Sequence, residues 1–217
     1  MLGRAILGII GNVGPEADEL LQRLIRLEAM AHGAKKDQDY LPMIVVKNPE
    51  ITDRTLAIFE GGRSPALGIV ESCKILESCG IYLAALPSNT SHFFKTEYQS
   101  NTPVYVIDII AVTMEAVQEV GATRAGLLAT TPTIATGLYE KRENKTGPVF
   151  VAPKPDAQEK FASAPPRARR ARCNCRAIRL RWELRHPGSI TLCRPRVPRN
   201  LRPRRNCLNA FGRQRCR

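Results

Sequence analysis

The amino-acid sequence predicts an α/β fold in which helices flank a parallel sheet, and two observations carry this prediction. First, short apolar runs alternate with segments whose apolar residues recur at helical spacing, from the N-terminus to about Lys160. Second, the run Ile-Tyr-Leu-Ala-Ala-Leu at 81–86 is unbroken, which is typical of a central parallel strand buried on both faces. The chain of 217 residues is long enough for one sizeable domain or two small ones.

Six strands and the helices between them follow from this alternation. Pro15 suits the first position of a helix, and either Thr52 or Asp53 suits the cap of a short one. The expected strands cover 5–10, 43–46, 81–86, 104–107, 125–129 and 148–151. The expected longer helices run from Pro15 to about 27, from Ser64 to Gly80, over 91–100, over 110–120 and onward from Ile134.

Two of these helices have an apolar face that we expect to be buried. In the first helix the face consists of Ala17, Leu20, Leu21, Leu24 and Leu27. In the helix after Ser64 it consists of Ala66, Ile69, Cys73 and Leu76. Cys73 is therefore expected to be a small core hydrophobe. Its separation from Cys79 fits neither a metal site nor a redox pair.

The basic residues gather at the C-terminal end. Residues 1–160 hold 16 Lys and Arg against 19 Asp and Glu, whereas residues 161–217 hold 17 Arg, no Lys and one acid. Because basic segments under selection use either cation, we infer that the segment 161–217 is translated in a shifted reading frame. The alternatives are a nucleic-acid arm and another disordered extension. We do not expect nucleic-acid binding, because beyond its first residue, Phe161, this segment offers only Trp182 and Phe211 to stack on bases.

Polar loops follow four of the expected strands at their carboxyl ends, where ligands bind in parallel α/β sheets. They are 11–15 (Gly-Asn-Val-Gly-Pro), 47–55 (Lys-Asn-Pro-Glu-Ile-Thr-Asp-Arg-Thr), 87–92 (Pro-Ser-Asn-Thr-Ser-His) and 130–133 (Thr-Thr-Pro-Thr). The first lacks G-x-G-x-x-G, so a plain strand-to-helix turn or a substrate loop is favoured over a dinucleotide site. The third sets small hydrogen-bonding side chains against a helix start, which suits a carboxylate or another small anion.

These loops resemble, in the same order, four motifs of the cofactor-independent aspartate/glutamate racemase family. They are similar to G-G-M-G-P, N-N-P-x-x-P-D-R-T, P-C-N-T-A-H and, with the residues before the last loop, L-L-A-T-x-G-T. Asn12 and Val13 depart from the first motif, and Ser88 stands where the family has its first catalytic cysteine. The second cysteine motif, G-C-T-E, would fall beyond residue 160 and is not found there.

The resemblance implies two similar α/β lobes with the active site between them. We therefore expect a first lobe over 1–110, an incomplete second lobe over 111–160 and an irregular arginine-rich tail over 161–217. Family members invert the α-carbon of aspartate or glutamate without pyridoxal phosphate. One cysteine thiolate removes the α-proton, and a thiol on the opposite face returns a proton. Without either cysteine in place we expect inefficient racemisation, because a serine hydroxyl is a far weaker acid than a thiol.

The resemblance also implies which residues form the pocket. Arg54 is expected to grip a carboxylate with two parallel hydrogen bonds, with a solvated surface arginine as the alternative. For Ser88 we favour a donor to the substrate carboxylate over a racemisation base, a hydrolase nucleophile activated by His92 or a helix cap. For Thr130 and Thr133 ordinary helix capping is the alternative. Besides Ser88, the expected binding residues are Asn12, Arg54, Asn89, Thr90, Thr130 and Thr133.

A racemase-family isomerase that acts on a small amino acid or dicarboxylate is our first hypothesis, and a non-catalytic dicarboxylate-binding remnant is the second. We expect no cofactor and no metal, since Cys173 and Cys175 lack the spacing of a zinc knuckle. No secretory signal or run of about 18 apolar residues is present, so we expect a cytoplasmic protein without membrane contact. Apolar surface on the last two strands should lack a cover, which leaves a homodimer open.

Overall fold

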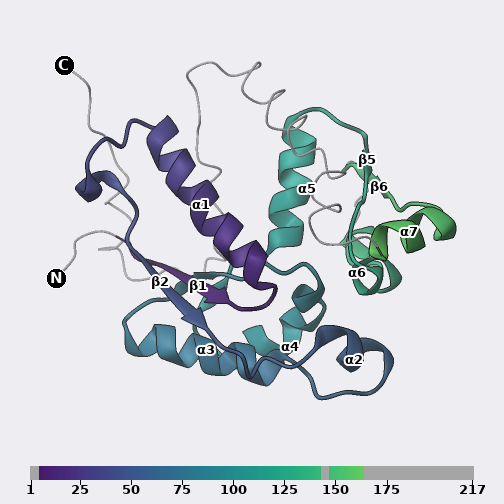
Figure 1. Cartoon of the computed structure of the whole chain (residues 1–217), viewed down its shortest axis with the longest axis horizontal. Helices are drawn as coiled ribbons and strands as arrows, with labels where there is room; N and C mark the ends of the chain where they lie inside the picture. The colour runs from purple at the N-terminus through teal and green to yellow at the C-terminus, as the bar shows by residue number, and fades with distance from the viewer. Residues whose placement is uncertain (1–4, 143–146, 164–217) are drawn as a thin grey trace.

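The computed structural model describes residues 5–142 and 147–163. Its centre is a four-stranded parallel sheet in the order β2-β1-β3-β4. The strands are β1 (Leu7–Gly11), β2 (Met43–Lys47), β3 (Leu83–Ala85) and β4 (Tyr105–Val106). Helices lie on both faces of this sheet, with α1 on one side and α3 on the other (Figure 1). The predicted α/β class with a helix-flanked parallel sheet is therefore confirmed.

The helices begin and end close to where the sequence places them, with three exceptions. Pro15 opens the first helix, and the Asp53 carboxylate caps the second by accepting from the amides of Thr55 and Leu56 at 2.6 and 3.1 Å. The α-helices are α1 (Pro15–Ala31), α2 (Arg54–Phe59), α3 (Ala66–Ser78), α4 (Lys95–Gln99), α5 (Ile109–Glu119), α6 (Thr131–Ala135) and α7 (Pro155–Ala162), and the 3-10 helices are η1 (Asp37–Asp39), η2 (Thr90–Phe94) and η3 (Glu140–Arg142).

The three exceptions have local causes. The expected helix over 91–100 is divided into η2 and α4, because the chain first forms a tight 3-10 turn. α6 begins at Thr131 rather than at Ile134, because Pro132 lies in its first turn and suits a helix start. α7 was not expected at all. Within the described residues, no helix combines the length and the apolar content needed to cross a membrane.

The main core lies between the sheet and α3, and it confirms one predicted apolar face while correcting the other. Of the α3 face, Ala66 is 2% exposed and Ile69, Cys73 and Leu76 are fully buried. The predicted buried face of α1 is wrong, because Leu20 and Leu24 are 43% and 44% exposed and its other three members are only half-buried. α1 covers only one part of its face of the sheet and stands apart from α5 (Figure 1), so no layer of the described chain covers these two leucines. The helical period predicts which residues share a face of the helix, but it does not predict whether another element packs on that face.

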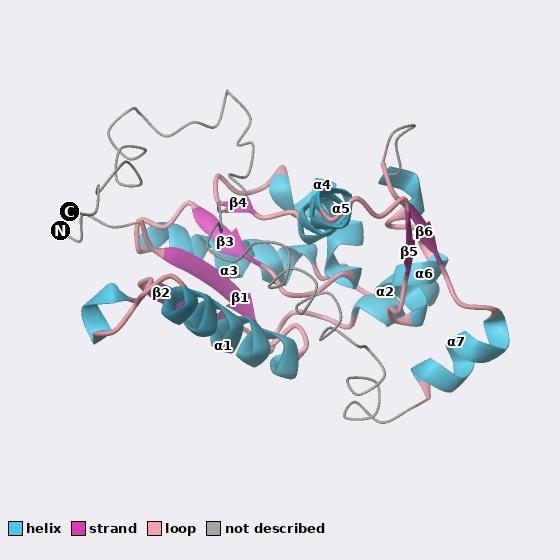
Figure 2. Ribbon diagram, turned by 90° about the horizontal axis from the view of Figure 1, so that it is seen from above, coloured by secondary structure: helices cyan, strands magenta, loops and turns pink. Residues whose placement is uncertain are grey.

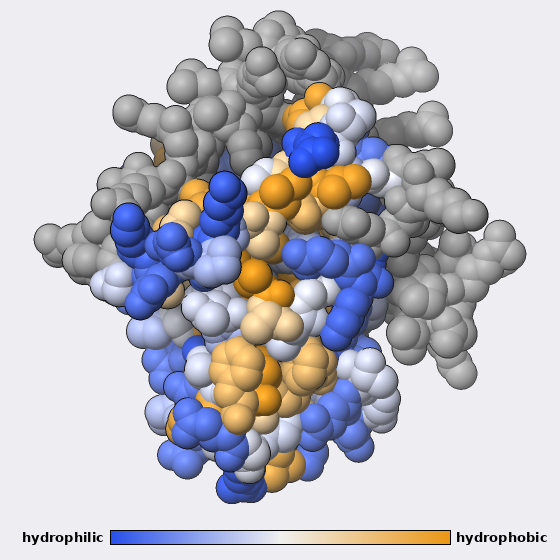
Figure 3. Space-filling model, turned by 90° about the vertical axis from the view of Figure 1, so that its right-hand side faces the viewer, coloured by the Kyte–Doolittle hydropathy of each residue, from blue (hydrophilic) through white to orange (hydrophobic). Residues whose placement is uncertain are grey.

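A second, two-stranded parallel sheet lies apart from the first (Figure 2). It consists of β5 (Arg124–Gly126) and β6 (Val149–Val151). Its own core contains Ile110, Leu127, Ala129, Leu138, Tyr139 and Phe150. As expected for a partly covered sheet, Leu128, Val149 and Val151 stay 41–45% exposed. Apolar side chains gather on the face of the molecule that this sheet and α2 share (Figure 3). The exact lobe boundaries stay predictions.

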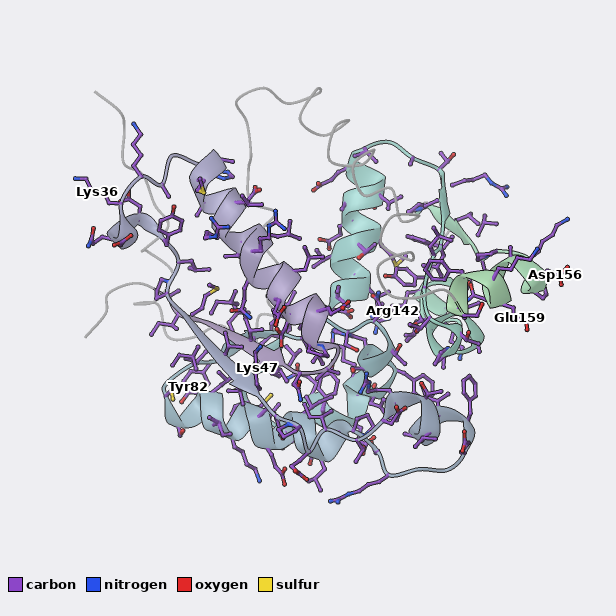
Figure 4. All side chains as sticks on the ribbon, viewed as in Figure 1. Lys36, Lys47, Tyr82, Arg142, Asp156 and Glu159 are labelled. Atoms are coloured by element: carbon purple, nitrogen blue, oxygen red, sulfur yellow. The ribbon has the colours of Figure 1, made fainter. Side chains whose placement is uncertain are left out.

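Asp108 joins the two sheets where α5 begins. One oxygen, Oδ1, caps α5 by accepting from the amides of Ile110 and Ala111 at 3.1 and 3.3 Å. The other, Oδ2, accepts from Lys95 Nζ at 2.8 Å and from the Arg142 guanidinium. Arg142 is the last residue of η3, which follows α6, and it lies at the foot of α5 (Figure 4). Burial alone would raise the pKa of this carboxyl, but the hydrogen bonds from Lys95 and Arg142 hold its pKa at about 2.

A methyl group at Gly8 should destabilise the fold, whereas the same group at another strand glycine should not. A Cβ at Gly8 would lie 2.7 Å from the Leu76 Cδ1 atom, and Leu76 is fully buried. Gly126, in β5, has no atom within 4 Å of its Cβ position. We expect Gly8→Ala to lower the free energy of unfolding by about 1–3 kcal/mol, and Gly126→Ala to change it by less than about 1 kcal/mol. Urea unfolding would test both, and equal losses would contradict the packing described.

Replacing Asp108 should lower the free energy of unfolding at neutral pH and make that free energy depend less on pH in acid. Because the pKa of Asp108 is lower in the folded chain than the ordinary 3.8, the unfolded chain takes up the proton before the folded chain does as the pH falls. The carboxylate therefore contributes about 2 kcal/mol above pH 4, and this contribution is lost as the pH falls through about 2. Asp108→Asn should lower the unfolding free energy at pH 7 by about 2–4 kcal/mol and flatten its fall between pH 4 and 2. Asp156→Asn, at an exposed position in the first turn of α7, is the control and should change neither.

Candidate functional site

The candidate site lies at the carboxyl ends of the parallel strands. The loops after β2, β3 and β5 lead into α2, η2 and α6, and α6 contacts both α2 and η2. These three segments, which are far apart in the sequence, therefore meet between the two sheets. The loop after β1 begins at the same edge, because Gly8 and Ile9 pair in parallel register with Ala84 and Ala85 of β3. All four loops that the sequence singled out thus follow strands that end on one side of their sheets.

Three threonine hydroxyls from the two sheets form a closed triangle. The Oγ1 atom of Thr90 lies 3.0 Å from that of Thr130 and 2.9 Å from that of Thr133, and the last two lie 3.0 Å apart. Thr133 is fully buried, Thr90 is 8% exposed, and Thr130 is exposed. Thr130 stands at the N-cap of α6 but makes no side-chain cap bond, so the capping alternative does not apply to it. The structure therefore brings together three of the expected binding residues.

Ser88 and Asn89 complete the same turn after β3. The Ser88 amide donates to the Leu86 carbonyl at 2.8 Å, and the Ser88 hydroxyl accepts from the Ser91 hydroxyl at 2.8 Å. Asn89 Oδ1 accepts from the Tyr139 hydroxyl at 3.0 Å. Tyr139 belongs to the core of the second sheet and is 3% exposed, and burial raises its pKa. It therefore donates its proton at neutral pH and holds the Asn89 amide in a fixed orientation.

His92 lies beneath this turn and does not touch the Ser88 hydroxyl. Its Nδ1 atom is 2.8 Å from the Ser88 carbonyl oxygen, and its Nε2 atom is 3.1 Å from the Ile107 carbonyl oxygen and 3.4 Å from the Ile109 amide. The ring is 2% exposed, and burial lowers its pKa below the ordinary value. Because neither ring nitrogen bonds the Ser88 hydroxyl, the geometry gives no support to a hydrolase nucleophile activated by His92.

Asn12 is held by the first turn of α1. It has a φ of 61°, in the left-handed region that asparagine tolerates better than most residues. Its backbone amide donates to Asp18 Oδ2 at 2.7 Å, and the Asp18 carboxylate is fully buried. Lys47 Nζ, at the end of β2, lies 3.7 Å from Asp18 Oδ1 and beneath the start of α1 (Figure 4). A Cβ at Gly11 would lie 2.5 Å from Asp18 Oδ2, so this arrangement needs glycine before Asn12.

Arg54 is half-buried at the first position of α2. α2 contacts α6, so the arginine lies on the side of the site where the threonine triangle is. Among the described residues, neither Arg54 nor the Asn12 side chain makes a direct bond to the triangle. These two expected residues therefore lie at the same edge of the sheet as the triangle but do not form one cluster with it. Tyr139 and Asp108 were missed by sequence reasoning, because their roles depend on contacts over 50 and 34 residues that no local pattern reveals.

The described cysteines lie away from this loop. Cys73 is fully buried in the main core, and burial raises the pKa of its thiol to about 11. Cys79 caps the end of α3, at the amino end of β3, opposite the candidate site. Neither residue can therefore supply a thiolate beside Ser88. Among the described residues no group of three or more His, Cys, Asp or Glu is placed to hold a metal ion. Cys173, Cys175 and the expected reading-frame shift lie outside the described residues.

Solved structures resemble this arrangement. An aspartate racemase from Picrophilus torridus is 29% identical with a TM-score of 0.61, and the match covers 72% of this chain and 66% of that protein. An aspartate racemase homologue from Pyrococcus horikoshii is 23% identical with a TM-score of 0.58, and the match covers 72% and 67%. The second likeness shows the fold alone. The chain spans about two thirds of the length of these proteins.

The match at the level of a protein family is broader. The family model described as Asp/Glu/hydantoin racemase matches residues 10–174. This range takes in all four loops and, apart from the first three residues of β1, both sheets described above, and it covers more than half of the chain. On these grounds the protein belongs to the Asp/Glu/hydantoin racemase family.

Proposed function

We propose that the protein binds a small acidic amino acid, aspartate or glutamate, between its two sheets, and that it inverts the α-carbon poorly if at all. The observation that carries the first half is the threonine triangle, which joins hydroxyls from both sheets at the strand ends. The observation that carries the second half is Ser88 in the turn where the family motif has a cysteine. Membership of the family supports the choice of substrate class.

The triangle is suited to an anion because its hydrogen bonds are exchangeable. Each hydroxyl has one proton and two acceptor lone pairs, and in the free protein those protons are directed at the neighbouring hydroxyls. A carboxylate that reaches Thr130, the exposed member, would give the hydroxyls a charged acceptor. Such charge-assisted hydrogen bonds are about twice as strong as neutral ones. Arg54 would supply the cation on the α2 side, and the Asn89 amide, oriented by Tyr139, would supply further donors.

Proton transfer is the weak part of this site. Removing an α-proton requires a base close to it, and a thiolate serves because a thiol with an ordinary pKa of about 8.5 is easily ionised. Ser88 offers a hydroxyl that accepts from another hydroxyl, Ser91, and no described carboxylate or imidazole bonds it to remove its proton. Cys73, with its pKa at about 11, and the remote Cys79 do not replace the thiol. The opposite base is also missing from the described residues.

Binding of the amino acid should depend on the triangle and on Arg54. We expect Thr130→Val to weaken L-aspartate binding about tenfold, because it removes one donor at the exposed corner, whereas Thr130→Ser keeps the hydroxyl and should stay within about threefold. Arg54→Lys should also lose affinity, because lysine cannot form two parallel hydrogen bonds. Titration calorimetry with L- and D-aspartate and glutamate would measure this. Absence of binding for all four in the unmodified protein would contradict the proposed pocket.

Exchange of the α-proton tests the proposed lack of inversion. In D₂O we expect proton NMR to show no exchange at the α-carbon of L- or D-aspartate above that of an Arg54→Ala control. Ser88→Cys alone should not create racemisation, because the thiol on the opposite face is still missing. Exchange by the unmodified protein at a rate typical of a racemase would contradict this half of the proposal and leave the binding half intact.

A binder without any catalytic role is the second candidate. The intact triangle beside a site without a thiol favours it. It differs from an impaired racemase in what the pocket must recognise, since a pure dicarboxylate binder has no need of the α-ammonium group. Succinate binding as tight as aspartate binding, measured in the same calorimetric series, would favour this candidate.

A further inference from the structure

His92 connects the turn that carries Ser88 to the segment that starts α5. One ring nitrogen, Nδ1, faces the Ser88 carbonyl oxygen at 2.8 Å. The other, Nε2, faces the residues on either side of Asp108, with the Ile107 carbonyl oxygen at 3.1 Å and the Ile109 amide at 3.4 Å. The ring packs edge-on against Tyr98, with 6.3 Å between ring centroids. The charged groups that act on it are Asp108 and Lys95.

The distances indicate which nitrogen carries the proton. The Ser88 carbonyl oxygen, at 2.8 Å from Nδ1, requires a donor there, because two lone pairs at that separation would repel. The Nε2 atom also faces a carbonyl oxygen, that of Ile107, but at the longer distance of 3.1 Å. With the proton on Nδ1, the neutral ring accepts from the Ile109 amide through Nε2, and the Ile107 contact is a close approach without a hydrogen bond. Burial lowers the pKa of the ring, which favours this neutral form at pH 7. The proton is assigned here from the hydrogen-bond geometry of the heavy atoms.

The turn needs such a restraint because, apart from bonds within the turn itself, its side chains bond residues packed with the second sheet. Asn89 is bonded to Tyr139, and Thr90 is bonded to Thr130 and Thr133. These bonds tie the segment to α6 and to the core of the second sheet. His92 acts on the other side, since it links the Ser88 carbonyl, through Nδ1–H, to the Ile109 amide at the start of α5, which donates to Nε2. With both sets of bonds the peptide between Ser88 and Asn89 has a fixed orientation, and so have the side chains that follow it.

We infer that His92 is a positioning residue of the candidate site, in which Nδ1–H holds the Ser88 carbonyl and thereby orients Asn89 and Thr90 for the ligand. The inference that ligand affinity depends on it rests on the proposed function. The bond itself does not, and it can be tested without any ligand.

Two substitutions separate the positioning role from simple packing. The side-chain amide of asparagine places an N–H near the position of Nδ1, whereas that of glutamine reaches the position of Nε2. His92→Asn therefore keeps the donor to Ser88 and loses the contact with the α5 turn. His92→Gln does the reverse. Both variants remove the same ring from a buried site, and glutamine fills more of the space than asparagine. A merely structural histidine would therefore make His92→Asn at least as damaging as His92→Gln, which is the opposite of the order expected for positioning.

The experiment has two arms on the full chain. In the first, a long-range ¹H–¹⁵N NMR spectrum of the unmodified protein at pH 7 reports the His92 ring. A proton on Nδ1, in a neutral or doubly protonated ring, supports the inference, and a neutral ring with its proton on Nε2 overturns it. In the second, calorimetry compares L-aspartate binding by the two variants. We expect His92→Asn to stay within about threefold of the unmodified protein and His92→Gln to lose about tenfold.

The outcomes of the two arms are distinguishable from failure of the proposed function. If the unmodified protein binds none of the acidic amino acids, the proposed function fails and the ring spectrum alone decides the role of His92. If it binds and both variants lose affinity equally, or in proportion to their loss of unfolding free energy, then His92 is a packing residue and the inference is overturned. If the variants do not fold, the first arm still gives the answer.

Discussion

Three hydroxyl groups connect the two halves of this protein at the place where its chemistry would occur. Thr90 begins η2, which follows β3 of the four-stranded sheet, and Thr130 and Thr133 lie at the start of α6, which follows β5. The two apolar cores are separate clusters, so polar contacts carry much of the connection between them. Tyr139 with Asn89, and Arg142 with Asp108, add to it. Polar contacts of this kind can exchange partners with a ligand, which a packed apolar interface cannot do without leaving a cavity.

The first sheet and its main core could be predicted because their signals are local. The apolar run at 81–86 yields β3 between two other strands, but the predicted burial on both faces is wrong in part, because Tyr82 is 55% exposed and Leu83 and Ala85 are half-buried. The spacing of Ala66, Ile69, Cys73 and Leu76 gives the buried face of α3. The exposed Leu20 and Leu24 could not be foreseen, because their exposure depends on which other elements pack near α1. α7 escaped notice because it has no clear apolar stripe, and Gln158 is its one buried residue.

The sequence predicts which loops form the candidate site, but not which of their side chains bond one another. Parallel strands place their carboxyl ends on one edge, so Thr90 and Ser88 could be expected near the loop after β1. That Thr90 would bond Thr130 and Thr133 depends on the packing of α6 against η2. The resemblance to the racemase motifs pointed to Arg54 and to the meaning of serine at 88. Nothing local pointed to Tyr139, Asp108 or the carbonyl contact of His92, because each joins segments that only the folded chain brings together.

The register of the two sheets also bears on how the chain folds. The pairing of Arg124 with Val149 closes a loop about a third as long as the one closed by the pairing of Gly8 with Ala84. The longer closure costs about 1 kcal/mol more in chain entropy, and distant pairings of this kind slow folding. The hydroxyl contacts join η2, after β3, to α6, after β5, so they depend on both pairings. The ligand-binding surface is therefore exposed to loss of either sheet, although it belongs to neither one alone.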